Sequence, residues 1–229
     1  MAAARALRMD GEALPHGTWV VVMSPVALSD GRQLAWHPPQ RVAFSLVEAR
    51  KLCRRAAPKR RNIMGSLVRR PDDDRAYMPA NSRAALDVVT DLWSAVLHSM
   101  AAIEAAANGL IDGLPDGTTV PRGDGEVVSK ERMVRRLNLD EKLSLVVPLA
   151  GGPMIKGTRP WELYVRVKGL RDDLVHVKED HYDPDPEVRS AYDRLLVGDA
   201  DDCAGDAFAV VQAIRPGFLG VDVVAVFEK

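Results

Sequence analysis

The stretch LDVVTDLWSAVLHSMAAIEAAANGLIDGL (86–114) decides the fold of this chain. Its main apolar side chains recur every three or four residues, at Leu86, Val89, Trp93, Val96, Met100, Ile103, Ala107, Leu110 and Leu114. An α-helix repeats about every 3.6 residues, so this spacing places them on one face. We expect Asn81 or Ser82 to cap the start of the helix and Pro115-Asp116-Gly117 to end it. A helix of this length with a continuous apolar face predicts a helical bundle.

Shorter helices are expected on the C-terminal side of this stretch. They start after Ser129, at Asp140, at Pro160, at Asp185-Pro186-Glu187 and at about Asp202, and the last four run to about Val147, Val177, Gly198 and Ile214. Together they define a predicted bundle over residues 81–215, with a loop at 115–128. The final stretch LGVDVVAVFE (219–228) alternates in polarity, so we expect residues 216–229 to form a C-terminal strand that pairs with the N-terminal VVVM (20–23).

Residues 1–80 are expected to form an N-terminal segment of different character. GTWVVVMSP (17–25) is β-branched and predicts a strand, and Asp30-Gly31 predicts a turn into a short return strand. A helix is expected from about Gln40 to Ala56, followed by a basic linker over residues 57–80 that contains three prolines. The predicted fold class is therefore mainly α, an antiparallel helical bundle with minor β-strands near the N- and C-termini.

Composition places the chain in a broad class. Its 229 residues are 47% hydrophobic, which is sufficient for a core, and no run of 18 apolar residues exists, so no membrane span is expected. The first residues lack the apolar core of a secretion signal. Cys53 and Cys203 match no metal-binding spacing, so a reduced, cytoplasmic protein is expected. The excess of arginine over lysine indicates a GC-rich bacterial genome.

The net charge of −1 hides an uneven distribution of charge. Residues 50–70 carry nine basic side chains and no acid, whereas residues 172–206 carry twelve acids and three lysines or arginines. Such separation can steer a polyanion to the basic region. A solvated surface helix and a mobile loop are the alternative. The candidate RNA contacts are Arg54, Arg55, Lys59, Arg60 and Arg61.

The stretch WELYVRVKGLRDDLVHVKED (161–180) carries the side chains of greatest chemical interest. The Arg171 guanidinium and the His176 imidazole can hold a phosphodiester and move a proton from a ribose hydroxyl, with Asp172 orienting one of them. The alternative is a structural histidine, which is the commoner role of a histidine on a helix. A helix C-terminus and nearby acids also favour the protonated imidazole, which is a poorer base but a good phosphate binder or general acid.

This same helix has two partly apolar faces. Its core stripe is Leu163, Val167, Leu170, Leu174 and Val177, and the other side carries Trp161, Tyr164, Val165 and Val175. A helix of this kind packs on two neighbours, and we expect the second neighbour to be the N-terminal segment or a second copy of the chain. On the long helix, Glu104 and Asn108 are supporting candidates, because a carboxylate there can pair with Arg171. An ordinary surface Glu and Asn are the alternative.

In the order of its helices and in RDDLVH (171–176), the sequence resembles the HEPN superfamily, helical bundles with an Arg–polar–x–x–x–His signature. The resemblance covers roughly residues 85–215 and includes IEAAAN (103–108) and DEKLSLVVPLAGG (140–152). It implies a HEPN-like bundle, often a homodimer with paired signatures along a cleft, and Arg171, Asp172 and His176 as the site. Many members are metal-independent endoribonucleases of toxin–antitoxin or other defence systems, which implies RNA and an antitoxin protein as partners.

A metal site is the competing interpretation of the segment that follows. Its potential ligands are His176, Glu179, Asp180, His181, Asp183 and Asp185. The two histidines are five residues apart rather than the four that aligns side chains on one helical face, so no metal or other cofactor is expected. Two function classes therefore remain open. One is a metal-independent endoribonuclease of HEPN type, and the other is a non-catalytic HEPN-like module that binds a partner protein or nucleic acid.

Overall fold

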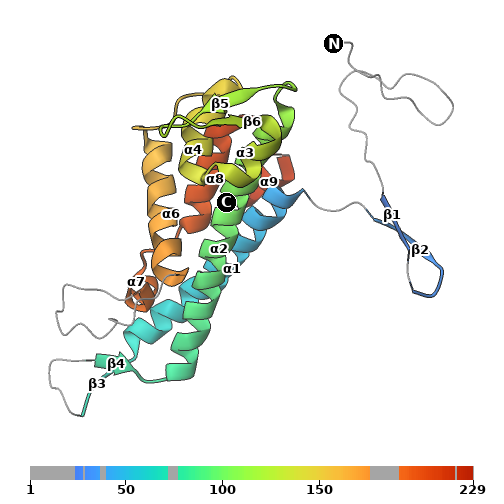
Figure 1. The fold of residues 1–229 in the computed structure, drawn as a ribbon. Coiled ribbons are helices and arrows are strands. Elements are labelled where there is room, and N and C mark those ends of the chain that lie inside the picture. Colours follow the sequence, from blue (N-terminus) through green and yellow to red (C-terminus); the bar gives the residue numbers. More distant parts are fainter. Residues whose placement is uncertain are drawn as a thin grey trace. The chain divides into compact units, whose positions relative to one another are not determined.

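The computed structural model describes residues 24–27, 29–36, 40–71, 77–175, 191–219 and 221–228. The chain divides into two compact units, Met1–Gln40 and Arg41–Lys229. The larger unit is mainly helical, as the sequence predicts, and Figure 1 shows its long helices lying alongside one another. It begins at Arg41, whereas the bundle was predicted from residue 81, because the first long helix belongs to the same compact unit as the others.

The N-terminal unit contains a β-hairpin. Strand β1 (Ser24–Ala27) pairs in antiparallel fashion with β2 (Gln33–Trp36). The expected turn is confirmed, since Gly31 has a φ of 82° and the Asp30 carboxylate accepts a hydrogen bond from the Arg32 backbone amide at 3.1 Å. The rest of the strand predicted over residues 17–25 lies mostly outside the described residues.

Helix α1 (Arg41–Gly65) is longer than predicted and contains Pro58. The expected end near Ala56 and the start of the linker at residue 57 are wrong. A proline removes one backbone hydrogen bond from a helix, but burial of Ala56 and Ile63 on both sides of Pro58 keeps the helix on the core. Its end leads into a second hairpin, β3 (Leu67–Arg69) paired with β4 (Tyr77–Pro79). The expected linker is thus largely helix and hairpin.

Helix α2 (Ser82–Gly113) is the central helix and confirms the main prediction. Asn81 caps it, because its side chain accepts a hydrogen bond from the Ala84 amide at 3.0 Å. Val89, Val96, Met100 and Ile103 are buried and Trp93 packs partly on the core. The prediction that Leu86 belongs to the core is wrong, since this residue is 63% exposed. The buried positions of that turn are Ala85 and Val88, so the packed face is rotated away from Leu86.

Length and hydropathy would also allow α2 to cross a membrane. More than half of its most apolar window is buried inside the bundle, however. The core helix of a protein in water passes the same test of length and composition. Burial by neighbouring helices therefore accounts for the apolar character of α2 without a lipid environment.

The chain after α2 folds into short elements rather than the loop predicted at residues 115–128. Strands β5 (Thr119–Pro121) and β6 (Val127–Ser129) form a third hairpin. Helix α3 (Lys130–Arg136) follows after Ser129, as expected, and buries Met133. The next helical stretch comprises α4 (Leu139–Glu141), the π-helical turn η1 (Lys142–Val146) and α5 (Val147–Leu149). Its cap is Asn138 rather than the predicted Asp140, because Asn138 and Glu141 form a reciprocal capping box.

The remaining long helices complete the bundle. Helix α6 (Arg159–Val175) and helix α8 (Cys203–Ile214) pack against each other and against α2, and α8 also contacts α1. A short helix, α7 (Ala191–Val197), lies between them in sequence. Along the bundle, α1, α2, α6 and α8 alternate in direction, so the bundle is antiparallel (Figure 1). The predicted start of a helix at Asp185 and the last residues of the helix predicted to Val177 lie outside the described residues.

The prediction of a C-terminal strand is wrong. Residues predicted to alternate in a strand form helix α9 (Val221–Phe227), whose Val223, Val224 and Phe227 pack against the core. The Phe227 ring stacks on the Phe208 ring of α8 with centroids 4.4 Å apart. A short valine-rich stretch is compatible with either a strand or a buried helix. The helix forms here because its apolar face, at positions i, i+1 and i+4, packs against α1 and α8. The proposed partner VVVM (20–23) lies outside the described residues.

Candidate functional site

A pocket of about 580 Å³ lies where α2, α3, η1 and α6 meet. Its apolar walls come from α2 and from the end of α3. Its polar groups come from four different elements. The lining residues are Leu97, Met100, Ala101, Glu104, Val134, Arg135, Leu137, Asn138, Leu139, Lys142 and Arg171. The pocket therefore combines three cationic side chains with one carboxylate, against a mainly aliphatic wall.

Lys142 is the most unusual of these groups. Its side chain is only 2% exposed, and its Nζ lies 3.5 Å from Oε1 of Glu104, whose side chain is 56% exposed. Lys142 opens the π-helical turn η1, and such wide turns interrupt α-helices most often at functional sites. A buried ammonium needs compensation for the loss of water. The half-exposed Glu104 carboxylate supplies part of it, which leaves the ammonium able to bind a second anion.

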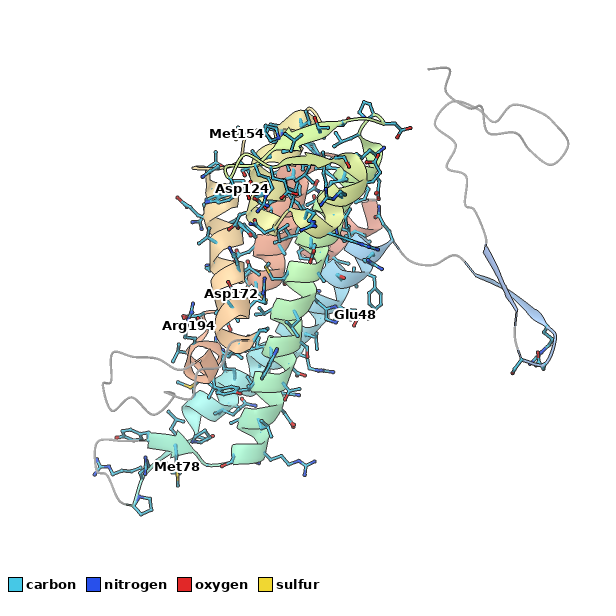
Figure 2. All side chains as sticks on the ribbon, viewed as in Figure 1. Glu48, Met78, Asp124, Met154, Asp172 and Arg194 are labelled. Atoms are coloured by element: carbon cyan, nitrogen blue, oxygen red, sulfur yellow. The ribbon has the colours of Figure 1, made fainter. Side chains whose placement is uncertain are left out.

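Arg171 reaches the pocket from α6. It lies between the buried Leu170 and Leu174, and one third of its side chain is exposed. Its Nη1 is 3.1 Å from Oδ1 of Asp172, the next residue in the chain. Figure 2 labels Asp172 on α6 beside α2. This local ion pair leaves the guanidinium at the pocket, because no carboxylate from another element draws it away among the described residues.

The structure brings together some of the predicted site residues and separates others. Arg171 and Glu104 line the same pocket, and Asp172 pairs with Arg171. The expected pair of Glu104 with Arg171 is replaced by the contact with Lys142. Asn108 does not line the pocket, and its buried Oδ1 has no hydrogen-bond partner among the described residues. His176 lies just beyond the last described residue of α6, Val175.

Sequence reasoning missed Arg135, Asn138 and Lys142. A signal for Lys142 was present in the chain, because Leu139, Leu143 and Val146 surround it at helical spacing. A single lysine at a position where the pattern expects an apolar side chain indicates a buried charge. Asn138 and Arg135 gave no such signal, since polar residues are ordinary at the junction of two short helices.

Below this pocket, α6 is tied to α4 by a polar cluster. The Tyr164 hydroxyl donates a hydrogen bond to Asp140, and Lys168 Nζ donates to the same carboxylate at 2.6 Å. Burial alone would raise the pKa of Asp140, but hydrogen bonds from Lys168 and Tyr164 outweigh it and hold this pKa below its usual range. Burial, with the hydrogen bond to Asp140, raises the pKa of Tyr164. The cluster is fully paired, which fixes the position of α6 at the pocket.

The second apolar face predicted on α6 is only partly covered by the chain itself. Tyr164 is fully buried and Trp161 packs partly on the core. Val165 and Val175 are each 49% exposed. The exposed part of this face therefore consists of Val165 and Val175.

The basic side chains of α1 are mostly engaged within the bundle. Arg55 donates to both oxygens of Asp91, with its Nε 2.8 Å from Oδ2, and Lys59 lies 3.3 Å from the same Oδ2. Arg60 pairs with Asp201, and Arg54 donates to the carbonyl of Val226 at 3.2 Å. Arg61 is exposed. These contacts reduce the positive charge that the five candidate RNA contacts offer to a ligand.

Asp91 is the anionic centre of this region. Its side chain is 8% exposed. Burial alone would raise its pKa, but hydrogen bonds from Arg55 and Lys59 hold the pKa of Asp91 below its usual range. The Arg55–Asp91–Lys59 group therefore joins α1 to α2 as an ionised network at neutral pH.

The metal interpretation finds no support within the described residues. Among them, no group of three His, Cys, Asp or Glu side chains is placed to hold an ion. The ligands named for that interpretation, His176, Glu179, Asp180, His181, Asp183 and Asp185, lie outside the described residues. In comparisons with known proteins, no protein-family model, no curated protein and no solved structure matches the chain.

Proposed function

We propose that the chain is a metal-independent endoribonuclease of HEPN type and that the pocket beside Arg171 holds an RNA phosphodiester. The observation that carries the proposal is the joint placement of Arg135, Lys142 and Arg171 on one pocket with a single carboxylate, Glu104. Three cations against one anion give the pocket a positive potential. Its volume of about 580 Å³ is in the range of sites for small ligands, and its aliphatic wall can lie against a base.

In this proposal each group has a defined role. Arg171 binds two non-bridging oxygens through parallel N–H donors, and Lys142 adds a buried point charge. Asp172 positions the guanidinium through their ion pair. His176, which follows α6 directly in sequence, takes the proton of the ribose 2′-hydroxyl or gives one to the departing 5′-oxygen. The 2′-oxygen attacks phosphorus and the bond to the 5′-oxygen breaks, so the product ends in a 2′,3′-cyclic phosphate.

A non-catalytic binding module is the second candidate, and one observation favours it. Among the described pocket residues, the single carboxylate able to act as a base is Glu104, and this group is in contact with Lys142. Catalysis therefore depends on His176. If His176 does not reach the pocket, the same cations still bind phosphate without cleaving it.

Assembly follows from the exposed part of α6. We propose that a second copy of the chain covers Val165 and Val175, which are both half exposed on the helix that carries Arg171. A two-fold pair would place two copies of the RDDLVH segment near one interface. In a cytoplasmic toxin–antitoxin pair, an antitoxin protein would occupy this face in place of the second copy.

Cleavage of RNA in EDTA tests the function directly. Wild-type protein is expected to release products with 2′,3′-cyclic phosphate ends, and His176→Ala and Arg171→Ala are expected to abolish release while keeping the helical circular dichroism spectrum. Arg171→Lys is expected to rescue little, because an ammonium cannot form the forked contact. Arg83→Ala, which removes an exposed arginine at the start of α2, is the matched control and should leave the rate unchanged.

The outcomes separate the two candidates. Full activity of His176→Ala would remove the proposed base and sink the ribonuclease mechanism. Tight binding of RNA by wild type and by His176→Ala, without cleavage by either, would establish the binding module. A strict requirement for a divalent ion would instead point to the segment from His176 to Asp185.

A further inference from the structure

The two cysteines of the chain meet in the core. Cys53 lies on α1 and Cys203 is the first residue of α8, 150 positions later. Their Sγ atoms are 3.7 Å apart, and both thiols are free and buried, with 4% and 1% of each residue exposed. A buried cysteine normally packs as a small apolar group. Here each sulfur lies beside the other, and the Cys53 thiol also faces the Ala200 carbonyl at 4.0 Å.

The surroundings make the two thiols unequal. The hydrogen bond with Cys203 lowers the pKa of Cys53, with a smaller contribution from the Arg50 charge, against the effects of burial and of Asp202. The same hydrogen bond and burial raise the pKa of Cys203. Arg50 and Asp202 also pair with each other at 2.9 Å beside the thiols. Cys53 is therefore the sulfur that ionises first, and a thiolate is the form that reacts with oxidants.

Only a small movement is needed to join the sulfurs. A disulfide bond is about 2.05 Å long, so the two atoms must approach by roughly 1.6 Å. Cys203 follows a turn that begins at Gly198, whose φ is 107°. It is the first residue of α8, so helix continues only on its C-terminal side. The Cys203 amide makes no i−4 hydrogen bond and is held by one bond to the Ala200 carbonyl at 3.2 Å, so this residue is less constrained than one inside the helix.

We propose that Cys53 and Cys203 are a redox modification site, which closes to a reversible intramolecular disulfide between α1 and α8 when the chain meets a peroxide. The Cys53 thiolate attacks one oxygen of hydrogen peroxide, an S–O bond forms, the O–O bond breaks and hydroxide leaves to become water. Cys203 then loses its proton and attacks Sγ of Cys53, the S–S bond forms and the S–O bond breaks with release of a second water. Two thiols thus give two electrons to one peroxide.

Closure of this bond would change the molecule in two ways. It would join helices from opposite ends of the chain, so the unfolded state would lose much of its freedom and the melting temperature would rise by roughly 5–15 °C. It would also fix α8 against α1 at the Arg50–Asp202 pair, at the start of the helix that packs on both α2 and α6. A dithiol reductant would reverse both effects.

The test treats the full-length chain with hydrogen peroxide and maps its peptides by mass spectrometry without reduction. Wild type is expected to lose both free thiols, to gain one cross-link between the peptides of Cys53 and Cys203, and to recover both thiols with dithiothreitol. Cys203→Ser is expected to stop at a sulfenic acid on Cys53, which dimedone labels. Cys53→Ser is expected to leave Cys203 unlabelled, and neither variant should show the rise in melting temperature.

Three outcomes would overturn the proposal. They are wild-type thiols that stay free at peroxide concentrations that oxidise unfolded chain, a sulfinic acid on Cys53 without a cross-link, and a cross-link found only between two chains on a non-reducing gel. Each can be read on the wild-type protein alone, so the result does not depend on the folding of the serine variants.

Discussion

At the scale of single residues, the buried charge of Lys142 is expected to favour ligand binding without stabilising the fold. A lysine that is 2% exposed loses most of its water, and its contact with Glu104 at 3.5 Å is too long to replace that water fully. Replacement of a buried ion by an apolar side chain of similar volume is often neutral or stabilising. The presence of a charge at this position is thus better explained by an anionic ligand than by folding.

The first prediction follows from that difference. Lys142→Met should leave the melting temperature unchanged or higher, and should weaken binding of a 2′-O-methyl RNA oligonucleotide roughly 10- to 100-fold, since hydrogen bonds to charged groups contribute about 1.5–3 kcal/mol. Fluorescence anisotropy and thermal melts measure the two effects. Lys156→Met, at an exposed lysine outside the pocket lining, is the control and should bind as wild type. A large loss of stability with unchanged binding would show that Lys142 serves the fold alone.

Asp91 leads to the opposite expectation, because its role is structural. Its folded pKa is depressed below the ordinary value of 3.8, so its contribution to stability is complete above that value and is lost as pH falls through the folded pKa. Asp206 works in the other direction, since burial raises its pKa in spite of Arg166. Lowering the pH therefore removes the stabilising effect of Asp91 and relieves the unfavourable burial of the Asp206 charge. Only a variant separates the two effects on the free energy of unfolding.

The second prediction isolates Asp91. Asp91→Asn should reduce stability at pH 7 by about 1–3 kcal/mol, a range that is modest because Arg55 and Lys59 are partly exposed. The difference in melting temperature between wild type and variant should shrink as pH is lowered from about 4 to about 2, because the folded pKa of Asp91 lies below 3.8. Thermal melts over that range measure it. A difference that stays constant across the range would show that Asp91 does not act through its charge.

At the scale of elements, the sequence predicted what periodicity over many residues determines. The length of α2 and the burial of Val89, Val96, Met100, Ile103 and Ala107 followed from a three-and-four spacing sustained over nine apolar positions. Short elements were less well predicted. Pro58 was interpreted as a helix end although tertiary packing carries α1 through it, and LGVDVVAVFE has a pattern that suits a strand or a short helix equally.

The candidate site shows the same limit. Arg171 and Glu104 were predicted because local motifs and helical faces are readable in sequence, and they share a pocket. The predicted pairing of these two side chains was wrong, because Glu104 contacts Lys142 instead. The rotation of α6 against η1 is set by the Tyr164–Asp140–Lys168 cluster, whose members lie 24 to 28 positions apart. Cys53 and Cys203 are 150 positions apart in the sequence, and no local sequence pattern indicates their contact.

The third prediction tests α9 as a helix that belongs to the bundle. Phe227→Ala should lower stability by about 1–3 kcal/mol, because Phe227 is only partly buried but stacks on Phe208 and lies under the Arg50 guanidinium. Chemical denaturation measures the loss. Val226→Ala is a useful comparison with a smaller apolar loss on the same helix. A stability equal to wild type in Phe227→Ala would mean that α9 does not pack on α1 and α8.

At the scale of the whole molecule, the basic and acidic blocks of the sequence partly neutralise each other. Arg50 and Arg60 of α1 pair with Asp202 and Asp201 in the turn before α8, and Arg55 and Lys59 are paired with Asp91. Charge separation along a sequence is therefore not charge separation in space. The proposed binding of RNA then rests mainly on the pocket cations, with Arg54 and Arg61 as the members of the predicted set that have no carboxylate partner among the described residues.

The last prediction concerns how strongly the affinity for RNA depends on salt concentration. Binding of single-stranded RNA loses affinity with salt at a logarithmic slope of about −0.7 for each phosphate neutralised. Three pocket cations give a slope of about −2, addition of Arg54 and Arg61 gives about −3.5, and use of all five candidate RNA contacts on α1 gives a slope steeper than about −5. We expect a value between the first two, measured by anisotropy from low to moderate salt. The double variant Arg54→Ala/Arg61→Ala should return a steeper slope to about −2 without changing the melting temperature. A slope near zero would exclude phosphate as the ligand, and a slope steeper than about −5 would mean that RNA displaces Asp91 and Asp201 from Arg55, Lys59 and Arg60.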